Sequence, residues 1–432
     1  MDYFFDKYYN AITDSMTRQQ FGFSVLAPLT EKIRCGHTSF SYPAAYNRQM
    51  REHPQPSIPL YMKIWTDTMV LTLNLNKQDS ILKPGTIITR INGMSERQLT
   101  DTMFRFMPSD GYSENVNYVR LSGAFPHYHR NILGLSPTYE VQYIDSTGAG
   151  KTTVIPVYDP STDSVAKRIV QTRTRQLDPK NKPKRLEYIR SLSFDSNSQY
   201  AVMTVNSFTG GRLPLFFRKS FRELRKKNIP NLIIDIRNNG GGNVSNYTAL
   251  AKYIRATPFK VCDTMVCNTR GLAGYNKYVK EGLLNSLILF FVSKKEHDGN
   301  YHFRYWEKHT FKPRKKNHYN GKVYVLISGS TFSASTLFAH AVKGQQNVSL
   351  LGEEAGGGAY GNSGIRIPDV VLPHTKMKVR LPLFRIVQYQ HGAKDGRGVM
   401  PDIFVPPTAE NVRKGIDGKM RKAIAIIQTT EK

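Results

Sequence analysis

The chain has 432 residues, 40% of them hydrophobic and 11% aromatic, and carries a formal net charge of +28. This length is too great for one small core and predicts two or three domains, folded over most of the chain. The Lys and Arg residues are spread along the chain without a zinc-finger or RNA-recognition motif, which argues against nucleic-acid binding as the main role.

Residues 1–59 predict an N-terminal helical segment. Apolar residues recur at helical spacing over residues 21–33, Gly36 ends the pattern, and His37 follows in a turn. Prolines at positions 54, 56 and 59 then indicate a linker. The first residues show no basic stretch followed by an apolar one, so we expect either a cytosolic protein or a chain whose export signal has been removed.

Residues 60–160 predict a small β-rich domain. Short strand patterns surround a helix that carries Leu99 and Met103. The run PGTIITRING resembles a PDZ-like module, a family whose members bind a peptide as an added strand along an exposed edge. By that resemblance the peptide-binding edge contains Pro84, Gly85 and Ile87. An ordinary small β domain is the alternative, because an insertion at residues 107–137 interrupts the pattern.

Residues 161–185 are polar and basic and predict a linker or an exposed hairpin. Residues 186–432 then alternate strand and helix patterns, which predicts a largely parallel sheet covered by helices. An aromatic and basic insertion follows at about residues 271–320, and its apolar run at 284–292 is far too short to span a membrane. Three cysteines cannot form a disulfide framework, although Cys262 and Cys267 are spaced to pair across a hairpin.

The most informative stretch is residues 323–342, VYVLISGSTFSASTLFAHAV. Its first half predicts a strand buried on both faces, and its second half has the spacing of one apolar helix face. Ser333 lies where the strand turns into the helix, close to N–H groups that can stabilise an oxyanion. The simpler interpretation is that Ser333 or Thr331 caps the helix. An earlier glycine turn, NNGGG, ends a strand of the same sheet and is expected at the same edge.

Four ordered motifs, LIIDIRNNGGGNV, STFSAS, LLGEEAGGG and GRGVMPDI, resemble the C-terminal processing peptidase family of serine peptidases, which includes tail-specific proteases and the tricorn core. The resemblance implies an α/β (α+β) fold, with a ClpP/crotonase-like ββα catalytic core and an inserted PDZ-like domain. It implies a serine endopeptidase acting on protein or peptide substrates in the cell envelope, periplasmic or extracellular, without cofactor, metal or transmembrane insertion. The resemblance does not decide whether the protein is a monomer or a homo-oligomer.

The family's site maps onto this chain residue by residue. Its nucleophile corresponds to Ser333, and its oxyanion hole to the N–H of Ala334 with that of Gly241 or, next, Gly242. Many members use a lysine about two dozen residues after the serine as base, but here no lysine occurs between Lys343 and residue 376. The chain is therefore either a catalytically inactive binding protein or obtains its base elsewhere.

The tricorn-like branch takes its base from a histidine ahead of the PDZ-like module. By that resemblance His37 is the general base and Asp395 the acid that orients it, with His391 as the rival base. A histidine base predicts that kcat/KM rises between about pH 6 and 7.5. Of the other candidates, His340 is expected to pack beside the helix and Asp402 to hold a turn.

Overall fold

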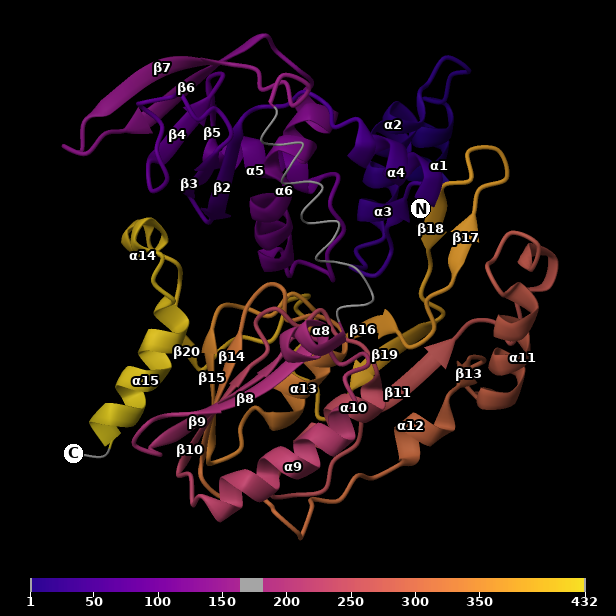
Figure 1. Cartoon of the computed structure of the whole chain (residues 1–432). Coiled ribbons are helices and arrows are strands. Elements are labelled where there is room, and N and C mark those ends of the chain that lie inside the picture. The colour runs from indigo at the N-terminus through magenta and orange to yellow at the C-terminus, as the bar shows by residue number, and fades with distance from the viewer. Residues whose placement is uncertain (1, 164–181, 431–432) are drawn as a thin grey trace.

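The computed structural model describes residues 2–163 and 182–430, which form two lobes (Figure 1). The basic linker predicted at 161–185 therefore lies mostly outside the described residues. One lobe holds the N-terminal segment and the β-rich module, and the other holds the predicted sheet domain. The first segment contains α1 (Asp2–Tyr9), α2 (Arg18–Gln20), the π-helical turn η1 (Phe21–Leu26), α3 (Ala27–Lys32), β1 (Phe40–Ser41) and α4 (Ala44–Glu52).

The β-rich module is one sheet with the strand order β2-β3-β4-β6-β7 and two helices packed on it. Its core is a separate apolar cluster that includes Ile88, Leu99, Met103 and Tyr139. The elements are β2 (Leu60–Trp65), β3 (Thr68–Asn74), β4 (Ile87–Ile91), β5 (Met94–Ser95), α5 (Glu96–Phe104), α6 (Asn115–Leu133), β6 (Thr138–Ile144) and β7 (Gly150–Pro156). The PDZ-like assignment stays a prediction.

The peptide-binding edge expected at Pro84, Gly85 and Ile87 is wrong. Ile87 pairs with Val70 on one side and Ile144 on the other, so β4 lies inside the sheet and has no edge for an added strand. Arg413 of α14 (Ala409–Lys414) also covers Gly85 and donates a hydrogen bond to its carbonyl oxygen over 3.4 Å. The edge was misplaced because the sequence predicts strands but not their order.

The second lobe is built on a six-stranded sheet with the order β20-β15-β14-β10-β9-β8. Every neighbouring pair is parallel except β8 with β9. This confirms the predicted parallel sheet. Its strands are β8 (Arg190–Phe194), β9 (Tyr200–Val205), β10 (Asn231–Asp235), β14 (Lys322–Ile327), β15 (Val348–Gly352) and β20 (Ile403–Phe404).

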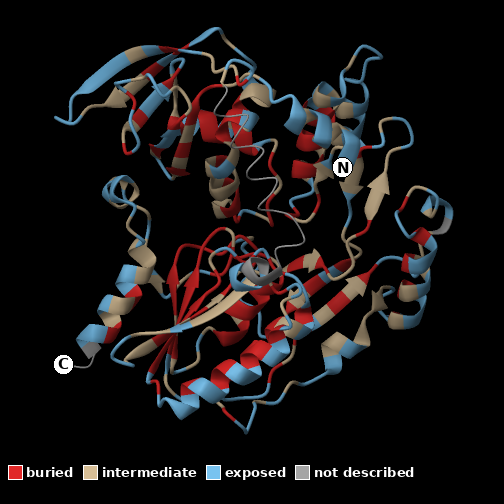
Figure 2. Cartoon of the chain, viewed as in Figure 1, coloured by how far each residue is buried: buried red, intermediate tan, exposed pale blue. Residues whose placement is uncertain are grey.

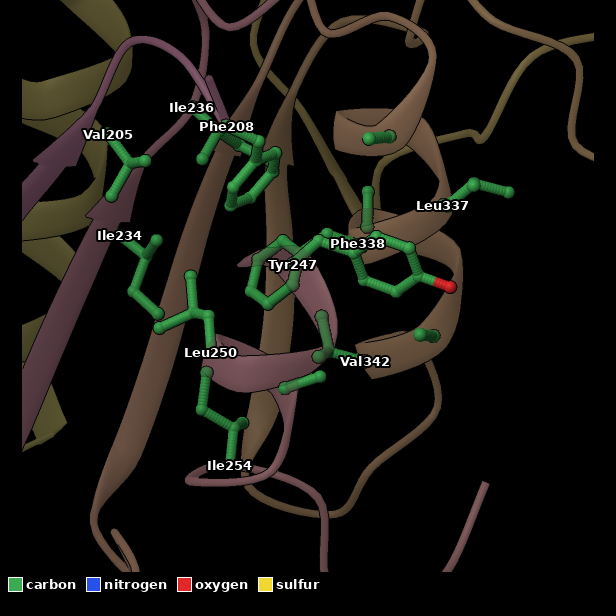
Figure 3. Close-up of a cluster of buried hydrophobic side chains, with 14 of the residues drawn as sticks. Val205, Phe208, Ile234, Ile236, Tyr247, Leu250, Ile254, Leu337, Phe338 and Val342 are labelled. Carbon is green, nitrogen blue, oxygen red and sulfur yellow. The ribbon is translucent and has the colours of Figure 1, made fainter. Parts of the chain in front are cut away.

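Helices cover both faces of this sheet, which explains the continuous apolar runs in its central strands. Alternate residues such as Ile234 and Val325 enter a core formed with α9 (Leu213–Lys226), α10 (Val244–Ala251) and α13 (Ala334–Val342). Figure 3 shows Tyr247 of α10 between the strands and Phe338 of α13. The intervening residues face α15 (Gly418–Thr430) in a second, smaller core. Figure 2 shows these central strands as buried.

A second sheet flanks the first, with the order β12-β13-β11-β19-β16. Strand β11 (Cys262–Cys267) was expected in the parallel sheet but pairs antiparallel with β19. Cys262 and Cys267 are free thiols at opposite ends of this single strand, about 16 Å apart, too far for a disulfide. The remaining elements are α8 (Lys182–Ile189), η2 (Ala273–Tyr275), α11 (Gly282–Val292), β12 (Lys294–Lys295), β13 (Tyr301–His302), α12 (Arg304–Lys308), β16 (Gly361–Gly364), β17 (Asp369–Val371), β18 (Lys378–Arg380) and β19 (Phe384–Gln388).

The two lobes are joined through the loop between α5 and α6, at the start of the predicted insertion. Tyr112 N–H donates to the carbonyl oxygen of Gly396 over 2.8 Å, and the Ser113 hydroxyl to that of Ala355 over 2.8 Å. A separate contact comes from β1, which pairs with β18 of the sheet domain. The N-terminal segment and the β-rich module are thus both anchored beside the edge where the glycine turns lie.

Candidate active site

Ser333 lies between β14 and α13, as the sequence predicted. Its backbone has φ 57° and ψ −127°, a left-handed conformation that a residue with a side chain adopts only when its surroundings enforce it. Its side chain makes no capping hydrogen bond to α13, so the simpler helix-cap interpretation is wrong for this residue. A serine held in a strained turn from strand to helix is the arrangement that exposes a nucleophilic hydroxyl.

Gly241 packs directly against this turn. A Cβ on Gly241 would lie 2.6 Å from Ser333 Cβ and 2.8 Å from the Phe332 carbonyl oxygen, and its φ of 102° also favours glycine. However, the Gly241 N–H already donates to Asn239 Oδ1 over 2.9 Å. No hydrogen bond of the described residues uses the N–H of Gly242 or of Ala334. These two donors therefore fit an oxyanion hole better than Gly241, whose role is to allow the close approach.

A third glycine run, GGG at residues 356–358, lies on the other side of the serine. Gly356 N–H donates to the Thr331 carbonyl oxygen over 2.9 Å, and a Cβ on Gly357 would lie 3.3 Å from Ser333 N. The LLGEEAGGG motif thus has a structural explanation, because its backbone forms one wall of the nucleophile turn.

His37 lies beside this turn although it is almost 300 residues earlier in the sequence. Its ring packs against the ring of Phe332, the neighbour of Ser333, with 4.7 Å between centroids. Both of its ring nitrogens are buried and lack a hydrogen-bond partner among the described residues. No hydrogen bond therefore joins His37 to Ser333 or to Asp395 in this structure. Two ring nitrogens that are buried without a hydrogen-bond partner are costly, and they indicate a functional site.

Asp110 is the residue that the sequence analysis missed. Its Oδ1 accepts a hydrogen bond from Gly36 N–H over 2.7 Å, and its Oδ2 one from Gly358 N–H over 3.3 Å. One of its oxygens, a ring nitrogen of His37 and the sulfur of Cys35 all lie within 4.8 Å of one another. Asp110 therefore lies beside His37 and connects it to the loop that flanks Ser333.

Burial dominates the electrostatics of this cluster. It lowers the pKa of His37 to about 4, assisted by the positive charges of Arg120 and Arg380. It raises the pKa of Asp110 to about 6, although the hydrogen bonds from Gly36 and Gly358 act in the opposite direction. His37 is therefore a neutral imidazole at neutral pH, the form that can accept a proton.

Asp395, the orienting acid expected from the resemblance, is exposed and accepts a hydrogen bond from Arg397 N–H within its own turn over 2.9 Å. It lines a cavity of about 670 Å³, together with His340 of α13 and Tyr389. His340 packs there, and its Nε2 lies 3.0 Å from the Tyr389 carbonyl oxygen. This confirms that His340 packs beside the helix.

The other candidates have structural partners. His391 is exposed, with its ring against Tyr360 and Nδ1 3.0 Å from the Gly392 carbonyl oxygen. Lys343 forms an ion pair with Asp402, whose carboxylate also accepts from Leu350 N–H, so Asp402 holds a turn as predicted. The remaining acids are also paired, Glu353 with Lys419 and Glu354 with Arg397.

Cys35, His37 and Asp110 form the one group of three side chains placed to hold a metal ion within residues 2–163 and 182–430. Burial and the negative charge of Asp110 raise the pKa of the Cys35 thiol, which opposes formation of a metal-binding thiolate. The group contains His37 and lies beside the Ser333 turn, so it is part of the same candidate site.

A comparison with known families identifies the sheet domain. Residues 199–405 match the family model described as Peptidase family S41, a range that contains Ser333 and the glycine turns. This part of the chain is an S41 peptidase domain. As an S41 peptidase it is a hydrolase of the serine type, which confirms the enzyme class expected from the motifs. No curated protein matches the chain.

Two solved structures, both of CPAF, share the fold of this S41 peptidase, and a third, the tricorn protease, is similar at a lower score. Mature CPAF complexed with lactacystin is 14% identical, with a TM-score of 0.64 over 97% of this chain and 90% of that chain. Mature CPAF alone is 14% identical, with a TM-score of 0.61 over 95% and 87%. The tricorn protease is 13% identical, with a TM-score of 0.40 over 100% and 34%. The two CPAF structures cover 97% and 95% of this chain, so the shared fold extends beyond residues 199–405.

Among the described residues of this S41 peptidase, no helix is both long and apolar enough to cross a membrane.

Proposed function

We propose that this S41 peptidase is an endopeptidase in which Ser333 is the nucleophile, His37 the general base and Asp110 the orienting acid. The observation that carries the proposal is the position of His37. A half-buried imidazole whose two nitrogens are buried and unpaired packs on the residue next to a strained serine, and a buried carboxylate lies beside it. This is the set of groups that serine hydrolysis requires.

In this mechanism Ser333 Oγ attacks the carbonyl carbon of the substrate peptide while its proton passes to His37. The N–H groups of Ala334 and Gly242 stabilise the oxyanion, and His37 then gives its proton to the leaving amine as the C–N bond breaks. In the second half of the reaction, water attacks the acyl ester while its proton passes to His37. His37 then returns this proton to Ser333 Oγ as the ester bond breaks and the acid product leaves. The carboxylate of Asp110 stabilises the imidazolium that forms twice in each cycle.

Asp110 replaces Asp395 in this proposal because of burial and position. Asp395 is exposed and bonded within its own turn, whereas Asp110 is 5% exposed and lies within reach of the His37 ring. An acid orients an imidazole best when water does not compete for the same hydrogen bond. The Asp110 carboxylate must turn slightly to bond the ring, since its present hydrogen bonds go to Gly36 and Gly358.

We infer that the site is at rest in this structure, because no hydrogen bond joins His37 to Ser333 among the described residues. The ring of Phe332 packs on His37, and a small shift of the histidine loop toward Ser333 would complete the catalytic arrangement. We infer that bound substrate favours this shift, as active-site hydrogen bonds often form only in the substrate complex.

A fluorophosphonate probe tests the proposal, because it reacts only with an activated serine. Covalent labelling at Ser333, identified by mass spectrometry, and its loss in Ser333→Ala and His37→Ala variants are the expected results. A folded protein whose Ser333 does not react would instead support the catalytically inactive binding protein. Unchanged labelling in His37→Ala would remove His37 as base.

The finer expectations from the resemblance are part of this proposal. We infer that the substrates are unfolded or tagged proteins cleaved in the cell envelope, periplasmic or extracellular, as in tail-specific proteases. Fractionation of the source cells tests the location, and finding the active enzyme in the cytosol would contradict it. Analytical ultracentrifugation decides whether the enzyme acts as a homo-oligomer.

A further inference from the structure

Helix α11 exposes large apolar side chains and buries a polar one, the reverse of what is expected for a helix on a surface that contacts only water. Its apolar sequence GLLNSLILFFV buries only Gly282, Asn285 and Leu289. The amide of Asn285 points inward, where it donates to two carbonyl oxygens and accepts from Arg366 Nε over 2.7 Å. The outward side chains are large and apolar, with exposed fractions of 73% for Leu283, 49% for Leu284, 56% for Leu287, 49% for Phe290 and 79% for Phe291.

A neighbouring groove extends this apolar surface. It has a volume of about 500 Å³ and lies between the segment before α11 and β17, where Val279 bridges to Val370. Leu272 N–H donates to the hydroxyl of Ser286 on α11 over 3.0 Å, so the groove wall is attached to the helix. The lining residues are Leu272, Tyr275, Tyr278, Val279, Pro368, Val370, Val371, Leu372, Pro373, Leu381 and Leu383. We call the exposed face of α11 and this groove the apolar patch.

Lysines stand at both ends of the helix. Lys277 and Lys280 precede α11, Lys294 and Lys295 follow it, and all are exposed. Within the described chain, no ion pair neutralises any of the four. Of the nearby acids, Glu296 is paired with Arg304, Asp369 with Lys378 and Arg380, and Asp298 lies 3.2 Å from His302 in the hairpin after the helix, which leaves Glu281 as the exposed acid directly before the helix. The patch therefore combines apolar side chains with uncompensated positive charge.

We propose that the apolar patch attaches the enzyme to the surface of an anionic phospholipid bilayer. Eleven residues form a helix about 16 Å long, which cannot cross a bilayer but can lie flat in its interface. Leu and Phe side chains then enter the boundary with the acyl chains, while lysines at both ends meet anionic headgroups. The adjacent groove gives an acyl chain a further apolar surface. Figure 1 shows α11 at the periphery of the sheet domain.

Charge distinguishes a bilayer from the other occupants. A second copy would bring two sets of unpaired lysines together in a chain that already carries +28, and like charges across an interface oppose association. The outward side chains of α11 itself are Leu and Phe, whereas the tyrosines of the patch, Tyr275 and Tyr278, lie in the groove, and Arg270 stacks on the ring of Phe290 and adds a further positive charge. This inference does not depend on the catalytic assignments.

Flotation of the full-length enzyme with phospholipid vesicles tests the proposal. We expect binding to vesicles of phosphatidylcholine mixed with phosphatidylserine, and much weaker binding to phosphatidylcholine alone. The Leu287→Ser/Phe291→Ser variant should bind vesicles at least about 100-fold more weakly than wild type, because two large side chains no longer enter the membrane. Both residues are exposed, so unchanged hydrolysis of a soluble peptide should show that this variant is folded.

The charge is tested with a matched pair of variants. Lys294→Glu/Lys295→Glu should weaken binding by at least about 25-fold, about fivefold for each lysine lost. Lys315→Glu/Lys316→Glu makes the same charge change at two exposed adjacent lysines outside the apolar patch. This variant should bind within about twofold to threefold of wild type, a range that includes the effect of the lower net charge of the whole protein.

Four results would overturn the proposal: equal binding to neutral vesicles, equal losses in the two lysine variants, vesicle binding that survives Leu287→Ser/Phe291→Ser, or no binding to either kind of vesicle. A concentration-dependent dimer that this apolar variant abolishes would identify a second copy as the occupant. If the apolar patch binds an acidic protein but no vesicles, its occupant is a protein partner. Each of these two findings also contradicts the bilayer.

Discussion

Asp110 binds the backbone of Gly36, with 2.7 Å between its Oδ1 and the Gly36 nitrogen, across a sequence separation of 74 residues. The second oxygen of the same carboxylate accepts from Gly358 in the sheet domain. One buried side chain of the β-rich module thus links the segment carrying His37 to the loop flanking Ser333. The β-rich module therefore contributes to the active site itself, in addition to any role in binding substrate.

Replacing Asp110 with asparagine should reduce kcat/KM by about 100-fold to 10,000-fold, because a neutral amide does not stabilise the imidazolium of His37. Asp395→Asn is the matched control, since it makes the same chemical change at the exposed acid, and it should stay within about threefold of wild type. Steady-state kinetics with one peptide substrate measure both. A large loss in Asp395→Asn with a small one in Asp110→Asn would restore Asp395 as the orienting acid.

The pH profile should differ from that of an ordinary histidine base. As pH falls, Asp110 takes up a proton first, near its pKa of about 6, and His37 follows near its pKa of about 4. Both protonations lower activity, so kcat/KM should be maximal at pH 7 and fall between about pH 6 and 4. This window lies below the range of pH 6 to 7.5 expected from sequence.

In Asp110→Asn, the part of the decline near pH 6 should disappear while the part near pH 4 remains. A profile of kcat/KM against pH over both variants measures this. One transition near pH 7, unchanged by Asp110→Asn, would show that neither shifted group controls the rate.

Gly241→Ala should abolish most activity, by about 100-fold or more, because its Cβ would lie 2.6 Å from that of Ser333 and displace the nucleophile. Gly240→Ala is the control in the same turn. A Cβ there meets nothing within 4 Å, so this variant should keep nearly full activity. Fluorophosphonate labelling rates give a second readout, and equal rates in the two variants would argue against the close packing of Gly241.

Lys343→Ala should leave kcat/KM unchanged within about twofold. Its ammonium group pairs with Asp402 at a half-exposed site, 2.6 Å from the carboxylate, and is therefore occupied. The loss of this pair should cost about 1 kcal/mol of stability or less, measured by urea unfolding. Strong loss of activity in a folded Lys343→Ala variant would revive a lysine base.

The nucleophile turn could be predicted from the sequence because local patterns determine it. A buried strand, small hydroxyl residues and an apolar helix face follow one another within residues 323–342, and the structure has the same order. The neighbouring position of NNGGG also followed from general rules, since parallel strands end at one edge of a sheet. The helical pattern around residues 21–33 was likewise local and appears as η1 and α3.

Asp110 could not be found in this way. It lies in the segment SDGYS, whose composition predicts an exposed turn, and only the packing of three chain segments buries it. Strand β11 was misplaced for a similar reason, because an apolar strand pattern does not specify which partner it will pair with. The sequence analysis excluded a membrane span at residues 284–292 but did not foresee the exposed apolar face of α11, which follows from the inward position of Asn285.

The distribution of the catalytic groups along the chain also affects the enzyme during its own synthesis. The proposed base comes from residue 37, the proposed acid from residue 110 and the proposed nucleophile from residue 333. A ribosome therefore releases the N-terminal segment and the β-rich module long before the hydroxyl that could attack a peptide bond exists. With these assignments we expect the growing polypeptide to be unable to cleave itself or its neighbours until the last strands of the sheet are in place.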